Sequence, residues 1–214
     1  MQKINELFNL ELSPLKEFFN RYIYPYEVLP NIHDFIIEYG NKLSSDYIKK
    51  DNTWIHKSVS IDSGVEIIGP AIIMEGVRLK HNAYIRENVI IGPNSVVGNS
   101  CEIKNSILIS NCEVPHFNYV GDSILGNKAH LGAGVILANL RLDKNNIIMD
   151  KQETNLRKIG AFIGDNTQIG CNSVICPGTT IYKNVTVYPL VMVRGIIPVD
   201  SIVKGNEIIK KEIR

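Results

Sequence analysis

Apolar residues recur along this chain at a spacing of six, and this is the most regular feature of its sequence. A helix repeats near 3.6 residues and a strand at 2, so this period fits neither element alone. It is typical of a chain that turns a corner every six residues and stacks its turns, a parallel β-helix. The positions in phase are Ile55, Ile61, Ile67, Ile73, Leu79, Ile85, Ile91, Val97, Ile103, Ile109, Ile163, Ile169, Ile175, Ile181, Val187 and Val193.

Asn and Gly residues support the same period, because they often stand three places after the apolar position. A corner needs backbone angles in the left-handed region, which these two residue types adopt most readily. We therefore predict corners at these positions. They are Gly64, Gly76, Asn82, Asn88, Asn94, Asn166, Asn172, Gly178 and Asn184.

The hexads divide the chain into three parts. Residues 1–50 lack them, and their aromatic residues and proline-led segments predict two or three short helices that cover the open end of the coil. Residues 51–200 form the predicted β-helix, from which the polar stretch 142–160 is expected to protrude as a loop. Residues 201–214 are predicted to form a short basic helix or a tail.

Composition narrows the classes of partner. The net charge of +1 gives no reason to expect nucleic-acid or membrane binding, and no apolar stretch approaches the length of a spanning helix. The start of the chain lacks the apolar core of a secretory signal, so we expect a cytoplasmic protein. The chain has four cysteines, Cys101, Cys112, Cys171 and Cys176, and their spacing is not that of zinc ligands. We interpret them as inert residues of a protein in a reducing compartment, and we expect no metal site.

The hexads resemble those of hexapeptide-repeat proteins. This resemblance implies a left-handed coil of triangular section, with three hexads, or about 18 residues, in each turn. Arg86 and Lys104 are 18 residues apart, and each directly follows an inward apolar residue. They should therefore stack on the outside of adjacent coils, where two like charges cost energy unless an anion lies between them. The alternative is that both side chains splay into solvent.

The phase of the repeat slips between Ile109 and Leu125, and His116 and Tyr119 lie in this irregular stretch. An irregular coil can turn a side chain outward, and a neutral imidazole can act as a general base near pH 7. Gly132 and Gly134 flank Ala133, and because they have no side chains a ligand can approach the backbone N–H groups there. A structural histidine is the alternative interpretation.

This stretch resembles the acetyltransferase region of the bacterial and archaeal enzymes that join glucosamine-1-phosphate acetylation to nucleotidyl transfer. The resemblance covers roughly residues 50–200. It is strongest in H-x-x-Y-x-G-D (His116 to Asp122), in G-x-x-x-x-x-G-A-G (Gly126 to Gly134) and in the A-N-L-R that follows. The L-R-K-x-G-A stretch from Leu156 to Ala161 looks like the archaeal branch.

The resemblance implies a role for each matching residue. His116 is the expected catalytic base, with Asn139 near the sugar and acetyl-CoA. Arg86, Lys104 and Tyr119 are expected to bind the sugar phosphate. The Ala133 backbone is expected to meet the thioester oxygen. The resemblance also implies acetyl-CoA as the donor and a homotrimer with sites between subunits. Lys144 and Arg194 are further candidates for contacts to coenzyme A.

The chain departs from the family pattern at two positions. His130 stands where the family has a second Asn near the sugar, so it is a candidate substrate contact. Asn145 stands where the family has Lys, and Lys144 is one residue short of that place. Residues 1–50 also lack the G-x-G-T-x-x-x-P loop of the nucleotidyltransferase domain, so we do not expect this chain to make a nucleotide sugar by itself.

The sequence therefore predicts an acetyl-CoA-dependent N-acetyltransferase acting on an amino-sugar phosphate such as glucosamine-1-phosphate. Two alternatives stay open. A non-catalytic trimer could keep the sugar-phosphate pocket without turnover. A metal hydratase similar to the γ-class carbonic anhydrases would need three histidines around zinc, and Gly121 stands where the third would be wanted next to His81 and His116.

Overall fold

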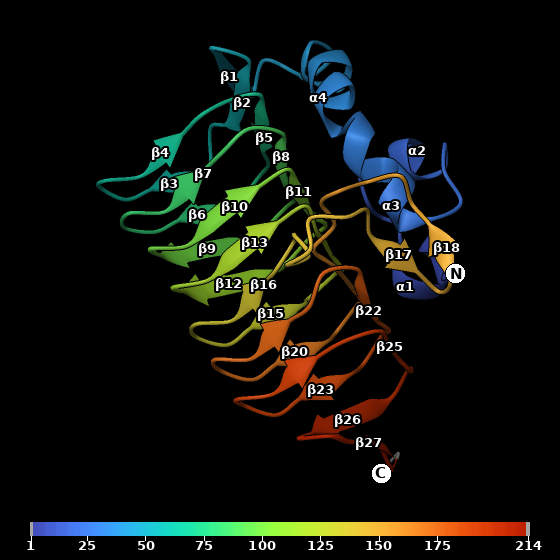
Figure 1. Ribbon diagram of the computed structural model, residues 1–214. Coiled ribbons are helices and arrows are strands. Elements are labelled where there is room, and N and C mark those ends of the chain that lie inside the picture. Colours follow the sequence, from blue (N-terminus) through green and yellow to red (C-terminus); the bar gives the residue numbers. More distant parts are fainter. Residues whose placement is uncertain (1, 213–214) are drawn as a thin grey trace.

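The computed structural model describes residues 2–212, most of which form one tapering coil of short strands (Figure 1). The strands lie on three faces that follow one another along the chain in the order A, B, C, and they pair in parallel from coil to coil. The coil is a left-handed parallel β-helix, so the predicted fold is confirmed.

Each face is one sheet, and its strands are very short. Sheet A contains β1 (Tyr47–Lys50), β2 (Thr53–His56), β5 (Ala71–Ile73), β8 (Val89–Ile91), β11 (Ser106–Leu108), β14 (Ile124–Leu125), β19 (Ala161–Ile163), β22 (Thr179–Ile181) and β25 (Ile196–Ile197). Sheet B contains β3 (Ser60–Ile61), β6 (Arg78–Leu79), β9 (Val96–Asn99), β12 (Glu113–His116), β15 (His130–Leu131), β20 (Gln168–Ile169), β23 (Thr186–Val187), β26 (Ser201–Lys204) and β27 (Glu207–Lys210). Sheet C contains β4 (Glu66–Ile67), β7 (Tyr84–Ile85), β10 (Glu102–Lys104), β13 (Tyr119–Gly121), β16 (Ile136–Leu137), β21 (Val174–Ile175) and β24 (Met192–Val193).

The hexad residues point into the coil and stack on their counterparts in the next turn. In sheet C, Ile85 pairs with Ile103 and Ile103 with Val120, and all three are fully buried. This stacked column removes apolar surface from water along the whole axis. The nine Asn and Gly residues predicted at corners all have positive φ, between 55° and 74°.

Two successive corners between sheets C and A are each one residue shorter than the regular corner of six residues. Five residues instead of six separate the inward residues there, Ile103 from Leu108 and Val120 from Leu125. Leu108 therefore occupies the core, and the prediction of Ile109 at that position is wrong. Ile109 is buried on the outside of the coil instead.

Serine hydroxyls close these short corners. Ser106 Oγ donates to the Lys104 carbonyl at 2.7 Å, and Ser123 Oγ donates to the Gly121 carbonyl at 2.8 Å. Ser106 Oγ also accepts from the Ser123 amide at 3.0 Å, which ties one short corner to the next. The two shortened turns thus satisfy their buried polar groups through a ladder of serines.

The N-terminal helices cover the side of the coil. They are α1 (Ile4–Leu7), α2 (Lys16–Phe19), α3 (Pro25–Val28), the 3₁₀ turn η1 (Leu29–Asn31) and α4 (Ile32–Gly40). Their apolar residues pack on the outer face of sheet A, against Ile72, Ile90, Ile107, Ile124 and Phe162. The expected covering of the open end is made instead by β1, which pairs antiparallel with β2. Within residues 2–212 no helix has the length and apolar character needed to cross a membrane.

The C-terminal segment is a hairpin, so the predicted helix is wrong. β26 and β27 pair antiparallel, joined by Gly205 with φ of 61° and Asn206. A Gly-Asn pair between two runs rich in isoleucine and valine favours a two-residue hairpin turn. The hairpin adds one strand to the end of sheet B.

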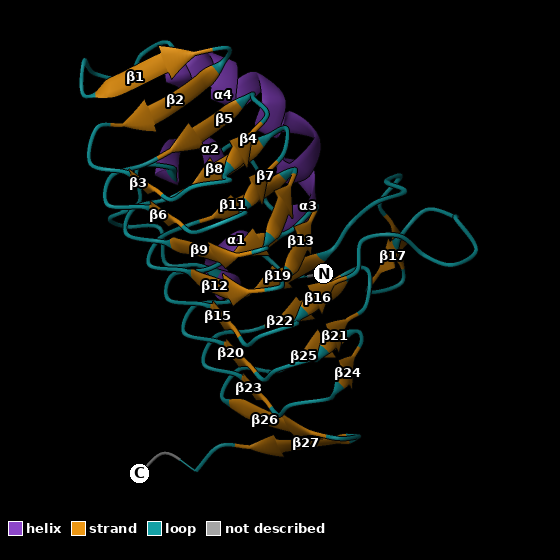
Figure 2. Ribbon diagram, turned by 90° about the vertical axis from the view of Figure 1, so that its left-hand side faces the viewer, coloured by secondary structure: helices purple, strands orange, loops and turns teal. Residues whose placement is uncertain are grey.

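The protruding segment leaves the coil after Asn139 and returns at Ile159, whose amide donates to the Asn139 carbonyl at 3.0 Å. We call residues 140–158 the excursion. It contains a small hairpin, β17 (Ile148–Met149) with β18 (Gln152–Glu153). Figure 2 shows the excursion standing out from the coil.

Asp165 ties the N-terminal segment to the coil. Its carboxylate accepts hydrogen bonds from the Asn9 amide at 2.6 Å, from the Asn127 amide at 2.8 Å and from the Asn127 side chain at 3.0 Å. Lys183 lies 4.0 Å away. Only 4% of Asp165 is exposed, so its carboxylate depends on these protein donors in place of water.

We predict that Asp165→Ala lowers the free energy of unfolding by about 2–4 kcal/mol, because it removes three hydrogen bonds to a buried carboxylate and leaves their part-buried donors unpaired. Urea denaturation measures this loss. Asp62→Ala is the matched control, since its carboxylate lies on the surface 3.6 Å from Lys80, and it should cost less than about 1 kcal/mol. Equal losses for the two variants would contradict the role given to Asp165.

Candidate active site

Arg86 and Lys104 stack on the outside of sheet C, as their spacing predicts. Ile85 pairs with Ile103, and the amide of Arg86 donates to the Ile103 carbonyl at 2.8 Å. Each basic residue follows one of these inward isoleucines, so the two side chains emerge from adjacent coils at the corner between sheets C and A. The side chain of Lys104 is 16% exposed and that of Arg86 33%.

One carboxylate, that of Glu87, contacts both cations, and a second, that of Glu102, contacts Arg86 alone. Arg86 donates to Glu102 Oε1 at 2.9 Å, and its Nε lies 3.4 Å from Glu87 Oε2. Lys104 Nζ lies 3.8 Å from Glu87 Oε1. The repulsion expected of two stacked cations is thus relieved by acidic side chains of the protein itself. An incoming phosphate would have to replace these contacts.

Tyr119 and Asn139 meet over Gly121, one and two coils below Lys104. The Asn139 side-chain amide donates to the Tyr119 hydroxyl at 3.1 Å and to Asp122 Oδ2 at 2.5 Å. Asp122 also accepts from Asn105 at 2.8 Å. Burial, and secondly the charge of Asp122, raise the pKa of Tyr119, so the phenol stays protonated and can donate a hydrogen bond.

Gly121 makes this arrangement possible. It is the residue that stacks directly below Lys104. A Cβ there would lie 2.5 Å from the Tyr119 hydroxyl and 2.7 Å from the Asn139 side-chain nitrogen. Without a side chain at this position, the phenol can lie flat along the sheet and reach Asn139 in the next coil.

His116 lies at the neighbouring corner, between sheets B and C, and its side chain is exposed. The inward residues on either side, Val114 and Val120, are six apart, so this corner is regular and the predicted irregularity at His116 is wrong. The His116 carbonyl accepts from the Gly134 amide at 2.9 Å, and the Ala133 carbonyl accepts from the Asn172 amide at 2.8 Å. Ala133 therefore lies one coil below His116 at the same corner, as a joint role would require.

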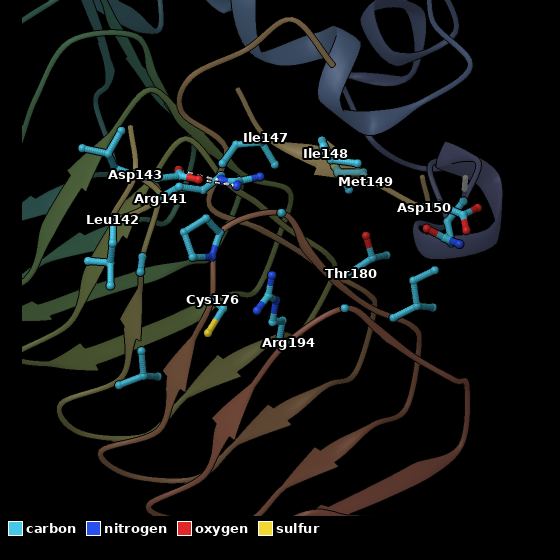
Figure 3. A pocket seen from close by; sticks show the side chains of 18 residues that line it. Arg141, Leu142, Asp143, Ile147, Ile148, Met149, Asp150, Cys176, Thr180 and Arg194 are labelled. Atoms are coloured by element: carbon cyan, nitrogen blue, oxygen red, sulfur yellow. Dashed lines mark hydrogen bonds and ion pairs between the residues drawn. The ribbon is translucent and has the colours of Figure 1, made fainter. Parts of the chain in front are cut away.

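The other predicted site residues lie apart from this cluster. His130 is on the outer face of sheet B, with Nε2 4.0 Å from Glu113 Oε2. Lys144 is exposed in a turn of the excursion. Arg194 follows β24 at the lower end of sheet C and lines a cavity beneath the excursion (Figure 3).

The sequence missed the acidic members of the cluster, Glu87, Glu102 and Asp122. A signal was present for Glu102, because a residue two places before Lys104 on a strand faces the same side. Asp122 ends the H-x-x-Y-x-G-D motif but received no role, because its contact with Asn139 depends on the short corner. Cys171, which was interpreted as inert with the other cysteines, is exposed and lies one coil below Ala133 at the His116 corner.

Two of the remaining cysteines and His81 are not part of the candidate site. Cys101 and Cys112 are buried in the core, as expected of inert thiols, and burial raises the pKa of Cys112 to about 12. His81 lies at the same corner as His116 but two coils above it, about 10 Å away along the stack. No group of three His, Cys, Asp or Glu side chains suited to a metal occurs within residues 2–212.

Comparison with known families and proteins gives matches over most of the chain. Residues 67–154 match the family described as GMPPB C-terminal domain, and residues 160–195 match bacterial transferase hexapeptide (six repeats). The bifunctional protein GlmU of Methanococcus maripaludis is 35% identical over 199 residues, which cover 83% of this chain and 45% of that protein. This chain thus spans less than half the length of that relative.

Two further proteins are similar over a smaller share. The bifunctional sugar-1-phosphate nucleotidylyltransferase/acetyltransferase of Sulfurisphaera tokodaii is 35% identical over 133 residues, covering 60% of this chain and 33% of that protein. A perosamine N-acetyltransferase from Caulobacter crescentus, solved with CoA and GDP-perosamine, is 20% identical with a TM-score of 0.34 and covers 69% of this chain and 50% of that chain.

We predict that Gly121→Ala destabilises the protein by about 1–3 kcal/mol, because the new methyl group pushes the Tyr119 ring away from Asn139. A double-mutant cycle in urea denaturation isolates the cause. In a Tyr119→Ala background the same substitution should cost less, since the ring is gone and only the close contact to the Asn139 side chain remains. An equal loss in both backgrounds would show that the glycine is needed for another reason.

Proposed function

We propose that this chain, a hexapeptide-repeat protein and a relative of GlmU, transfers an acetyl group from acetyl-CoA to the amine of an amino-sugar phosphate such as glucosamine-1-phosphate. The observation that carries the proposal is the cluster on sheet C. It joins two stacked cations, a protonated tyrosine and an asparagine next to a corner with an exposed histidine. Nucleotidyl transfer is not part of the proposal, because this chain spans only 45% of the relative.

The cations provide the sugar-phosphate site in this proposal. A phosphate placed between Arg86 and Lys104 would take over the contacts that Glu87 and Glu102 make in the free protein. Arg86 is suited to this because its guanidinium can offer two parallel N–H donors to phosphate oxygens. Holding the phosphate orients the sugar and lowers the entropic cost of bringing its amine to the donor.

The reaction follows from the groups at the two corners. The sugar amine attacks the thioester carbonyl, and a C–N bond forms. His116 accepts the amine proton. When the tetrahedral intermediate collapses, the C–S bond breaks and the coenzyme A thiolate receives that proton from His116. A backbone N–H near Ala133 would stabilise the oxyanion, and the Asn139 side chain would help to position the amine.

The proposal includes a homotrimer. Exposed apolar residues collect on the lower part of sheet C and its corner, and a second copy packed there would remove them from water. They are Leu190 at 78% and Met192 at 70% exposed. Light scattering after size exclusion tests this point, and a monomer at micromolar concentration would overturn it.

We predict that His116→Ala lowers the rate of coenzyme A release by about 10²–10⁴-fold, because the amine loses its base. A thiol-detecting assay with acetyl-CoA and glucosamine-1-phosphate measures this rate. His81→Ala is the matched control, since His81 occupies the same kind of corner and its Nδ1 bonds only the Ser63 hydroxyl at 3.0 Å. If wild type, His81→Ala and His116→Ala all release coenzyme A at the same background rate, the catalytic proposal fails.

We predict that Arg86→Gln raises KM for the sugar phosphate about 10–100-fold and changes kcat little, because the lost contact acts on bound phosphate. Arg78→Gln on sheet B, an exposed arginine outside the cluster, should leave KM unchanged. Stabilisation by sugar phosphate that depends on Arg86 but comes without acetyl transfer would point to a non-catalytic binding protein. An unchanged KM in Arg86→Gln would exclude the phosphate role.

A further inference from the structure

A second candidate binding site lies beneath the excursion, away from the cluster on sheet C. A cavity of about 590 Å³ lies between the excursion and the lower coils. Figure 3 shows the side chains that line it. Its size is within the range of sites for small organic molecules. Arg86, Lys104, His116 and Tyr119 do not line it, so it is separate from the proposed acetyl-transfer site.

The roof of this cavity is held in place by the protein. Ile147 and Met149 of the excursion are 1% and 4% exposed and face the coil. Backbone bonds fix this segment, because the Ile147 amide donates to the Leu156 carbonyl at 2.8 Å and the Thr154 amide donates to the Ile147 carbonyl at 3.2 Å. Gly178 allows the close approach, since a Cβ there would lie 2.6 Å from Ile147 Cγ2. The site is therefore preformed.

Among the charged residues that line the cavity, Arg194 is the cation without an ion-pair partner within residues 2–212. Arg141 donates to Asp143 Oδ1 at 2.9 Å, so these two charges compensate each other. Asp150 lies toward the opposite side of the cavity from Arg141 (Figure 3). Arg194 points toward the cavity in the same view, and it forms no ion pair with any residue from 2 to 212. An anion next to Arg194 would compensate this charge.

The floor of the cavity contains a buried polar side chain, that of Thr180. Thr180 continues the outward column of sheet A that is otherwise apolar from Ile72 to Phe162. It is 1% exposed, and its hydroxyl is the one buried side-chain polar atom without a hydrogen-bond partner within residues 2–212. Valine would fill the same space without an unpaired group, so packing alone does not account for a threonine in this floor.

We propose that this cavity binds a small organic anion with an apolar body, with its acidic group on Arg194 and its body against Leu140, Ile148 and Pro177, which line the cavity. This assigns Arg194 to a site of its own, in place of the contact to coenzyme A that the sequence suggests. The excursion begins directly after Asn139, so an occupant would also touch the segment that follows the candidate acetyl-transfer site.

A pair of fluorescent probes tests the proposal on the full chain. The anion 8-anilinonaphthalene-1-sulfonate and the uncharged N-phenyl-1-naphthylamine share their ring system and differ in the sulfonate. We expect saturable binding of the anion to one site per chain. Arg194→Gln should weaken it about tenfold or more, because a charged hydrogen bond is lost, and should change binding of the uncharged probe less than about twofold.

Two further arms make the result decisive. Arg78→Gln, on an exposed arginine of sheet B outside the cavity, should bind both probes as wild type does. Ile148→Asp, on an exposed residue of the roof, should weaken both. No binding of the anion, equal affinities in wild type and Arg194→Gln, or displacement of the anion by coenzyme A would each overturn a separate site. Acetyl transfer is not measured in this experiment, so its outcome does not depend on the proposed function.

Discussion

The stacking of one inward apolar residue on the next is the contact on which the rest of this protein depends. Each turn of the coil is too small to bury its own core, so its stability comes from the turns above and below. The same contact sets the register of the outer face. Arg86 and Lys104 are neighbours only because Ile85 lies on Ile103, and Tyr119 reaches Asn139 only because Val120 lies on Leu137. Core packing and site geometry are thus one constraint.

The short corners between sheets C and A are where this regular scaffold acquires individual chemistry. Asn105 and Asp122 occupy these corners, with φ of 43° and 49°, and Asn139 stands at the equivalent place one turn later. A strand of two or three residues offers one or two outward positions, whereas a tightened corner directs further side chains toward the same region. The excursion leaves from this place too, so both candidate sites adjoin one edge of the coil.

The sequence alone was sufficient for the coil, its corners and the stacking of Arg86 on Lys104, because these follow from a strict period. It was insufficient wherever the period changes by one residue. The shortened corners moved the core position from Ile109 to Leu108 and left His116 at a regular corner. The carboxylates of Glu87 and Glu102 were missed because a pattern of apolar positions says nothing of which outer side chains pair. The terminal hairpin was missed because its alternation spans only a few residues on each side of Gly205.

The N-terminal helices have a consequence for assembly. They bury the outer column of sheet A, from Ile72 to Phe162, so one side of the three-sided prism is permanently occupied over much of its length. In the proposed trimer, sides B and C are the two that are left to contact other copies of the chain. A closed ring needs two different, complementary patches on each member, one for each neighbour. A prism with one side covered by the chain's own helices has two free sides, one for each neighbour. It has no free third side on which a further copy could add to the ring.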